Sequence, residues 1–335
     1  MGLGTRLRLR LQRRRLQVRA IRKRRELTRR KTRASAELPT DGTLLFATTY
    51  NERIRLPFFL DYYRALGVRH FLIVDNASDD GSDEYLTEQP DVWLWSTTAS
   101  YKRARFGTDW LNWLKLRYAH DRWTLTVDAD EFLVYPFCDT RPIDALTDWL
   151  DRADVTSFGT LLLDMYPDGP VSEAIYGEGQ DPLDVACWFD AGNYSYKPNP
   201  RHKNLWIQGG PRARVFFRDT PKAAPSLNKI PLVRWNRKYV YASSTHMLLP
   251  RGLNRVYDET GGEKASGALL HTKFLNTLGQ KVEEEALRGQ HYAAGREYAA
   301  YAASAKTGLW TDWSERYLGW QQLEQLGLIS PGDWA

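Results

Sequence analysis

The sequence has few features of a disulfide-stabilised or membrane-spanning protein. Only Cys138 and Cys187 are cysteines among its 335 residues, which excludes a disulfide framework, and no Cys/His spacing typical of a zinc site occurs. No apolar run reaches the length of about 18 residues that a membrane-spanning helix needs. We therefore expect a cytoplasmic protein, since unpaired cysteines are typical of a reducing compartment.

What the chain does contain is a very uneven distribution of charge. Residues 1–33 hold 15 of the 47 Lys and Arg residues and a single acidic residue, Glu26. The remainder has 32 basic and 40 acidic residues, a formal charge of −8, although the whole chain is at +6. A basic arm thus precedes a mildly acidic body, and the arm has no apolar core of a secretory signal.

The basic arm allows two interpretations. As a helix it would place five apolar side chains within an arc of about 80°, and such a cationic helix suits the inner face of an anionic membrane. The same composition is typical of a disordered, solvated arm. Nucleic-acid binding is not expected, because no recognition motif accompanies the arm. The five apolar residues are Leu3, Leu7, Leu11, Val18 and Ile21.

From residue 44 onwards, strand-like and helix-like segments alternate. This predicts an α/β fold with a mostly parallel, Rossmann-like sheet and helices on both faces. Strands are predicted at 44–50, 68–74, 92–96, 123–127 and 157–165, and helices at 55–66, 82–86, 108–119 and 142–152. After residue 170 the pattern is more irregular, with strands within 229–249, a helical stretch at 276–305 and a short helix near 314–326.

Polar residues follow three of the predicted strands: Asn51-Glu52, Asp75-Asn76 and Asp128 to Glu131. In open α/β sheets ligands bind beyond the carboxyl ends of the strands. Asp128 and Asp130 would lie on the same side of an extended backbone. Carboxylates at the end of a buried strand suit a hard divalent cation, Mn²⁺ or Mg²⁺, which would share its coordination with substrate phosphates.

Four motifs in one order carry a family resemblance. Residues 44–135 resemble the family 2 glycosyltransferases of the A-type fold, and most closely bacterial members with an Asp-x-Asp-Glu-Phe motif. The resemblance implies a hexosyltransferase that moves a sugar from a nucleoside diphosphate donor to an acceptor hydroxyl. A bacterial surface glycan or a lipid-linked glycan is the implied acceptor. The motifs are Asn51-Glu52, Leu66-Gly67-Val68-Arg69-His70-Phe71, Asp75-Asn76-Ala77-Ser78-Asp79-Asp80-Gly81 and Asp128-Ala129-Asp130-Glu131-Phe132.

The resemblance also implies roles for residues that follow the first two strands. Thr48, Tyr50 and Glu52 would line the pocket for the nucleotide base. Asp75 would touch the base or ribose, with Asn76 and Ser78 nearby. The alternative for Asp75 is an acid that caps the loop 78–81.

Further roles concern the metal and the phosphates. Asp128 would approach the ribose and the metal, Asp130 would ligate the metal at the catalytic centre, and Glu131 would support them. In enzymes of this fold a histidine from the second half often completes the metal shell. His246 and His271 are the candidates, His271 being slightly favoured, and the alternative for each is a buried, hydrogen-bonded imidazole.

Basic residues along the chain could meet the diphosphate or a charged acceptor. The candidates are Arg105 in the cluster 102–105, Arg212, which alternates with Arg214 on a predicted strand, and Lys229. The alternative for the cluster is a solvated basic loop. Lys115 likewise could either contact phosphate or a charged acceptor, or be solvated.

The catalytic base is left open by the sequence. The Glu-Asp and Gln-x-x-Arg-Trp motifs of many family 2 enzymes are not found, so Asp164, Asp168, Glu173 and Asp258 all remain candidates to deprotonate an acceptor. A non-catalytic nucleotide- or carbohydrate-binding protein of the same fold is the alternative function. We divide the chain into 1–43, the arm and linker; 44–170, the donor half; 171–275, the acceptor half; and 276–335, a C-terminal helical segment.

Overall fold

A nine-stranded sheet crosses the molecule in the order β1-β4-β3-β2-β5-β11-β7-β14-β6. The computed structural model describes residues 3–257, 264–279, 281 and 308–334. The strands of this sheet are β1 (Thr28–Arg29), β2 (Leu44–Thr49), β3 (His70–Asp75), β4 (Val92–Ser96), β5 (Arg122–Thr126), β6 (Glu131–Val134), β7 (Ser157–Asp164), β11 (Asn228–Trp235) and β14 (Ser266–His271).

Most strands of the sheet share one direction. β4, β3, β2 and β5 are parallel neighbours, and β14 is parallel to β7. β11 is antiparallel to both β5 and β7, so those two strands point the same way. Only β1, β11 and β6 oppose the common direction. The predicted α/β class with a mixed, mostly parallel sheet is confirmed, as expected for an A-type fold.

Helices cover both faces of the sheet, because successive strand residues point to opposite sides. Leu45 and Ala47 of β2 belong to the core cluster that includes residues of α2 (Leu56–Ala65), α3 (Ser82–Thr87) and α5 (Ile143–Arg152). Leu44 and Phe46 face the other way, into the cluster that includes α4 (Thr108–Tyr118). Both faces are therefore buried, which explains the almost continuously apolar strands.

The second half adds short strand pairs to the sheet. β9 (Tyr194–Asn199) pairs with β10 (Asn204–Gly209), and β12 (Val240–Ser243) pairs with β13 (Met247–Leu249). β15 (Ser314–Arg316) pairs with β8 (Trp188–Asp190). The helix predicted near 314–326 is therefore wrong in its first part, and only α8 (Trp320–Gln325) is helical there. The helix predicted at 276–305 lies mostly outside the described residues.

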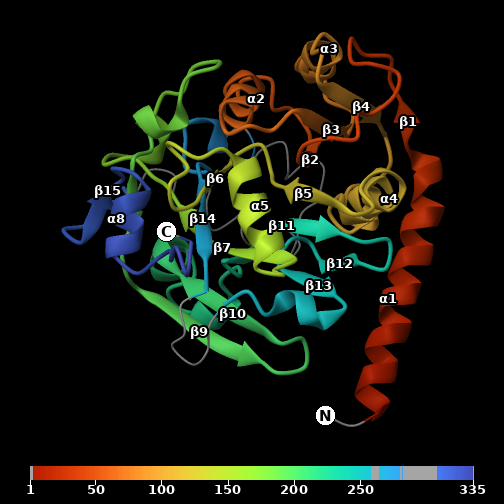
Figure 1. The fold of residues 1–335 in the computed structure, drawn as a ribbon. Coiled ribbons are helices and arrows are strands. Elements are labelled where there is room, and N and C mark those ends of the chain that lie inside the picture. The colour runs from red at the N-terminus through yellow and green to blue at the C-terminus, as the bar shows by residue number, and fades with distance from the viewer. Residues whose placement is uncertain (1–2, 258–263, 280, 282–307, 335) are drawn as a thin grey trace.

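The basic arm is folded. It forms α1 (Leu3–Lys23), and β1 then pairs with the outer strand β4. Figure 1 shows α1 running along one side of the molecule past α4, β12 and β13. The interpretation as a disordered arm is therefore wrong, because contacts with the body supply the stability that an isolated cationic helix lacks.

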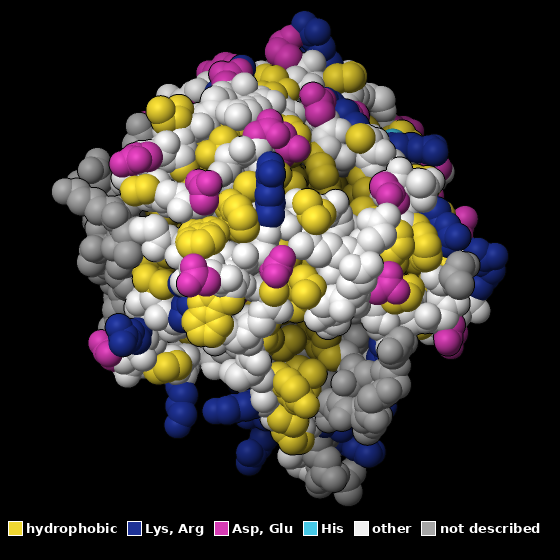
Figure 2. All heavy atoms as spheres, turned by 90° about the vertical axis from the view of Figure 1, so that its left-hand side faces the viewer, with side chains coloured by type: hydrophobic (Ala, Val, Ile, Leu, Met, Phe, Trp, Pro, Cys, Tyr) yellow, Lys and Arg dark blue, Asp and Glu magenta, His cyan; other side chains and the backbone are white. Residues whose placement is uncertain are grey.

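Among the described residues, the side of the molecule away from α1 shows no comparable concentration of positive charge (Figure 2). In Figure 2, acidic and basic side chains are interspersed there among hydrophobic ones. This agrees with the net negative charge of the chain beyond residue 33. The marked segregation of charge is thus a property of the arm.

The cation Lys115 lies inside the protein. Lys115 of α4 is fully buried, and its Nζ has no hydrogen-bond partner among the described residues. It lies 4.2 Å from the centroid of the Phe46 ring and within 5.6 Å of those of Tyr241 and Trp235. Burial holds the pKa of Lys115 well below its usual value. The sequence allowed Lys115 to be either a solvated cation or a direct phosphate ligand. Its burial fits neither interpretation.

We predict that Lys115→Met stabilises the protein by about 1–3 kcal/mol, since it removes a buried polar group without a partner at similar volume. Because the pKa of Lys115 is lowered in the folded state, the buried amine destabilises the wild-type protein at pH values below the pKa of an unfolded lysine, about 10.4. The stability gained by Lys115→Met should therefore shrink as the pH rises towards that value. Urea unfolding at several pH values measures this. A loss of stability at pH 7 would show that attraction to the three rings outweighs desolvation.

Candidate active site

Three acidic residues lie where β5 passes into β6. Asp128 and Asp130 belong to the connecting loop, and Glu131 begins β6. Ala129 and Asp130 form a turn, so the expected extended backbone at Asp-x-Asp is wrong. The side chains of Asp128, Asp130 and Glu131 are 58%, 20% and 2% exposed. The two aspartates can therefore meet a ligand, whereas Glu131 lies beneath them.

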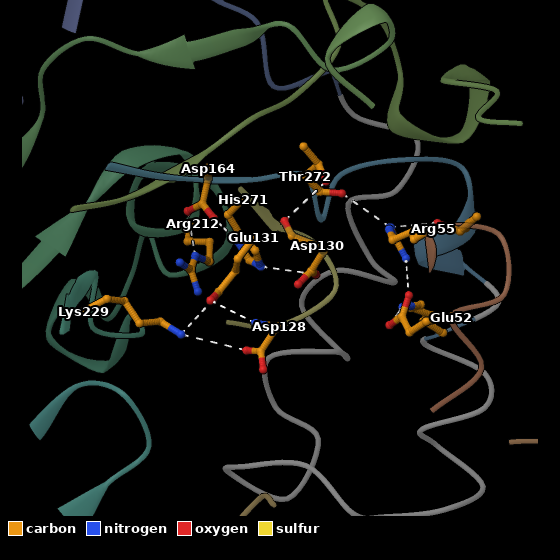
Figure 3. A network of polar contacts seen from close by, with 12 residues as sticks. Glu52, Arg55, Asp128, Asp130, Glu131, Asp164, Arg212, Lys229, His271 and Thr272 are labelled. Atoms are coloured by element: carbon orange, nitrogen blue, oxygen red, sulfur yellow. Dashed lines mark hydrogen bonds and ion pairs between the residues drawn. The ribbon is translucent and has the colours of Figure 1, made fainter. Parts of the chain in front are cut away.

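The buried Glu131 is neutralised by Lys229 of β11. Lys229 Nζ lies 2.7 Å from Glu131 Oε1 and 3.9 Å from Asp128 Oδ2. The backbone N–H of Asp128 donates to the other Glu131 oxygen. Partial burial and the charge of Glu131 raise the pKa of Asp128, while Lys229 opposes the rise. Lys229 thus organises the loop through Glu131, with Asp128 at its margin (Figure 3).

A second chain of contacts begins at Asp130. His271 is the last residue of β14, which lies between β6 and β7. His271 therefore pairs with Glu131 on one side and with Asp164 on the other. Its Nδ1 lies 2.6 Å from Asp164 Oδ1, and its Nε2 lies 3.4 Å from Asp130 Oδ2. Arg212 donates to the second Asp164 oxygen at 2.7 Å. The order Asp130, His271, Asp164, Arg212 alternates in charge (Figure 3).

Charge pairing sets the protonation of this chain. Burial alone would lower the pKa of His271, but Asp130 and Asp164 outweigh it and raise it to about 8. Burial opposes ionisation of Asp130 as well, yet His271, Arg55 and Lys281 hold its pKa well below the usual range. The imidazolium of His271 is therefore the main group that stabilises the charge of Asp130, with Arg55 and Lys281 adding to it.

The donor set meets part of what a divalent cation requires. No group of three or more His, Cys, Asp or Glu side chains arranged to hold a metal occurs within the described residues. Asp130 and His271 nevertheless offer one oxygen and one nitrogen, and Asp164 orients the imidazole as carboxylates commonly do in metal sites. Two protein ligands suffice for a cation that takes its other ligands from diphosphate and water.

A second ion-pair group lies beside Asp130. Arg55, which is 2% exposed, donates to Glu52 at 3.1 Å and to the backbone oxygen of Thr272. Thr272 in turn donates its N–H to the Asp130 carbonyl at 2.9 Å. Lys281 also pairs with Glu52. Glu52 therefore forms ion pairs with two cations. The expected role of Glu52 in the pocket for the nucleotide base did not include these pairs.

A small pocket adjoins the acidic loop on the α4 side of the sheet. Asp128 and Glu131 line it together with Thr48, Thr245 and Tyr241. The Thr48 and Thr245 hydroxyls are buried and have no hydrogen-bond partner among the described residues, so they are available to a polar ligand. Gly107, at a φ of +70°, lets the backbone approach Thr48, where a Cβ would lie 2.6 Å from the hydroxyl oxygen. Of the expected base-pocket residues, Thr48 is the one in this pocket.

Other predicted donor residues are already engaged by the protein. Both Asp75 oxygens accept from Ser78, as in the alternative of a loop-capping acid. Asn76 donates to the Thr97 and Ala99 carbonyls. Tyr50 lies just after β2 and is partly buried.

The predicted strand on which Arg212 and Arg214 would alternate is wrong, and Arg105 is engaged by the protein. Arg105 donates to Asp109 and to backbone oxygens of β12, so it joins α4 to that strand. Arg212 and Arg214 lie in a single helical turn, Arg212–Phe216, and not on a strand. They pair with different carboxylates, Asp164 and Asp190.

The remaining candidates lie apart from the chain of contacts. His246 is held through Nδ1, 2.7 Å from the Asn228 carbonyl, and burial, with Lys229, lowers its pKa to about 3. No contact between described residues joins it to Asp128 or Asp130. Asp168 and Glu173 are exposed after β7, and Asp258 lies outside the described residues.

Sequence reasoning missed Arg55 and Thr272 as supports of the site. Thr272 directly follows the candidate ligand His271 within Leu-Leu-His-Thr-Lys-Phe, and this position could have indicated its role. Arg55 had none, because an arginine near the start of a predicted helix reads as a surface residue.

We predict that Lys229→Met destabilises the protein by about 3–5 kcal/mol, because it leaves Glu131 buried without its cation. The double variant Lys229→Met/Glu131→Gln should recover much of that loss. Urea unfolding of the single and double variants measures both effects.

The control is Arg234→Met, which breaks an exposed ion pair with Asp151 whose side chains are 46% and 36% exposed. It should cost no more than about 1 kcal/mol. An equal cost for Lys229→Met would contradict the assigned role of Lys229.

Comparison with known proteins gives only remote structural similarity. No protein-family model and no curated protein sequence matches the chain. A Pyrobaculum calidifontis mannosyltransferase solved with GDP-Man and Mn²⁺ has 19% identity and a TM-score of 0.26. The match covers 54% of this chain and 56% of that one. A Bacillus anthracis protein described as a candidate glucose-1-phosphate thymidylyltransferase, solved with sucrose, has 9% identity and a TM-score of 0.30, covering 85% and 94%. At these scores neither similarity carries a functional argument.

Proposed function

We propose that this protein is a metal-dependent glycosyltransferase that transfers a sugar from a nucleoside diphosphate donor to an acceptor hydroxyl. The observation that carries the proposal is the chain Asp130–His271–Asp164 beside a polar pocket lined by Asp128 and Thr48. An oxygen ligand and an oriented imidazole suit a divalent cation that also binds a diphosphate, and the neighbouring pocket offers hydroxyls to the nucleotide. The family resemblance of residues 44–135 supports the same reading.

In this proposal Asp130 and His271 hold Mn²⁺ or Mg²⁺, and Asp128 faces the ion or the ribose. The cation would offset the charge that develops on the departing diphosphate. His271 must lose its proton to serve as a ligand, and Asp164 accepts the hydrogen bond from Nδ1 that keeps Nε2 directed at Asp130. Asp164 is thus a positioning residue here, since both its oxygens are engaged by His271 and Arg212.

A polar group of the nucleotide would reach into the small pocket between β2, α4 and β12, where Thr48 and Thr245 offer hydroxyls. Asp168 and Glu173, both exposed, are the candidates among the described residues for the base that deprotonates the acceptor. A bacterial surface glycan or lipid-linked glycan is the proposed acceptor class, on the family resemblance alone.

We predict that Asp130→Asn abolishes Mn²⁺-dependent nucleotide binding while the fold persists, since a neutral amide is a poorer ligand for a hard cation. Thermal unfolding with a panel of nucleotide-sugars, with Mn²⁺ or EDTA, measures this. A donor at 100 times its Kd adds about 2.7 kcal/mol to the stability of the wild-type protein.

The matched control for this prediction is Asp144→Asn. Asp144 lies in the first turn of α5 and is partly exposed, so this variant should keep the full metal-dependent stabilisation. Unchanged Mn²⁺ affinity and turnover in Asp130→Asn would refute the assignment of the metal site.

We predict that His271→Ala weakens Mn²⁺ affinity by about tenfold or more, whereas His246→Ala leaves it within about twofold. The reason is that His271 Nε2 faces Asp130, while His246 is bonded to the Asn228 carbonyl. Isothermal titration with Mn²⁺ in the presence of a bound nucleoside diphosphate measures both. Equal affinities in the two variants would mean that carboxylates, phosphates and water hold the metal without histidine.

Turnover separates the proposed enzyme from a binding protein of the same fold. The enzyme should hydrolyse its donor slowly or transfer the sugar, with Mn²⁺ required. Metal-dependent donor binding without any turnover, with a range of acceptor sugars supplied, would favour the non-catalytic alternative.

A further inference from the structure

Helix α1 uses one face to pack against the body of the protein. Leu9 and Ala20 are 6% and 1% exposed, and Leu9 and Leu16 belong to a small core cluster with Val240 and Leu249. Arg19 forms an ion pair with the buried Asp109 of α4 at 2.5 Å. The helix is thus held in a defined orientation relative to α4 and the β12–β13 pair.

The opposite face of α1 presents apolar side chains to solvent. Leu7, Leu11, Val18 and Ile21 are 56%, 44%, 47% and 39% exposed. At about 100° per residue, Leu7, Leu11 and Val18 fall roughly opposite Leu9 and Leu16 on the helix. The packing that buries one face therefore directs the apolar stripe outwards. The side chain of Leu3, also predicted on this stripe, is not described.

Positive charge surrounds the exposed stripe. The segment Leu3–Lys23 contains nine Arg and Lys residues and no Asp or Glu. Within the described part of the chain, Arg19 and Lys23 are the cations of α1 that pair with carboxylates. Arg8, Arg14, Arg15 and Arg22 are exposed, and helical spacing places them within about one quarter-turn of the stripe.

From these two faces we infer that α1 is a preformed docking surface for an anionic lipid bilayer. The aliphatic stripe would enter the boundary between headgroups and acyl chains, and the flanking guanidinium groups would bind lipid phosphates. No described helix is both long and apolar enough to cross a bilayer, so the surface would lie on the membrane.

Charge and chemistry favour a bilayer over two other occupants. A second copy of the chain docked stripe to stripe would bring the nine cations of each helix together without compensating acids. A nucleic acid would satisfy the arginines but would leave the aliphatic stripe without an apolar partner. Of these three occupants, an anionic lipid surface is the one that matches both the charge and the apolar area.

The docking surface adds a spatial constraint to the molecule. Leu111 of α4 and Tyr241 of β12 line the pocket beside the acidic loop, and α1 packs against these two elements. Because α1 is fixed to the walls of the pocket, membrane attachment would set the distance of the candidate site from the lipid surface. The inference goes beyond the proposed transfer reaction and does not depend on it.

Vesicle co-sedimentation of the full-length protein tests the docking surface. The wild-type protein should bind vesicles of phosphatidylcholine with about 30% phosphatidylglycerol and bind pure phosphatidylcholine vesicles at least about tenfold more weakly. The triple variant Leu7→Asn/Leu11→Asn/Val18→Asn keeps every charge, yet it should lose about tenfold or more in affinity for the anionic vesicles. Binding should weaken as salt rises from about 0.1 M to about 0.5 M.

The matched control places the same change elsewhere on the surface. Val155, Ile175 and Leu318 are 37%, 76% and 78% exposed, and their joint replacement by Asn should leave vesicle binding unchanged. Circular dichroism and thermal unfolding establish that both triple variants are folded.

Several outcomes would overturn the inference. Equal binding of the stripe variant and the wild-type protein would show that the apolar stripe is not used. Wild-type binding to neither vesicle type, with light scattering showing a dimer that the stripe variant loses, would assign the surface to a second copy. Tight, salt-sensitive binding of DNA that the stripe variant retains, without vesicle binding, would assign the arm to nucleic acid. None of these readouts involves donor or turnover, so they are separate from any failure of the proposed reaction.

Discussion

The candidate site depends on the insertion of β14 between β6 and β7. This arrangement brings together segments that are far apart along the chain: the acidic loop before β6, the end of β7 and His271. Hydrogen bonding between strands fixes the spacing of their ends, so Asp130 and Asp164 lie on either side of one imidazole. A change that displaced β14 would separate these residues even if each strand kept its own conformation.

Buried charge explains why the surroundings of the site are so rich in ion pairs. An ionised side chain taken out of water costs several kcal/mol unless an opposite charge or hydrogen bonds compensate. Glu131 obtains this compensation from Lys229, and Asp164 obtains it from Arg212 and His271. These pairs use up groups that the sequence suggested as ligands for phosphate. They also leave Asp128 and Asp130 as the acids of the loop with access to solvent.

The cost of burying a charge also distinguishes Lys115 from the arginines of α1. Lys115 lies inside the protein among aromatic rings, where a cation is costly, whereas the arginines of α1 lie outside, where they are hydrated. The arm is nonetheless structured, because Leu9, Leu16 and Arg19 attach one face of α1 to the body. An apolar stripe that remains exposed after such packing is informative, since the fold has already buried the apolar residues that it needs.

Periodicity and strand-end chemistry were enough to predict much of this protein. The α/β class, the main strands and helices, and the position of the acidic loop after β5 all follow from local patterns, because burial on two faces of a sheet leaves a continuous apolar signature. Which histidine faces Asp130, and which arginine pairs with which acid, could not follow from local patterns. His246 and His271 occupy similar apolar contexts in the sequence, and only the pairing of β14 with β6 and β7 distinguishes them. Likewise, helical spacing predicted the apolar stripe of the arm, but the contacts of Leu9 and Arg19 with distant elements decided which way that stripe faces, since tertiary contacts join residues that share no local signal.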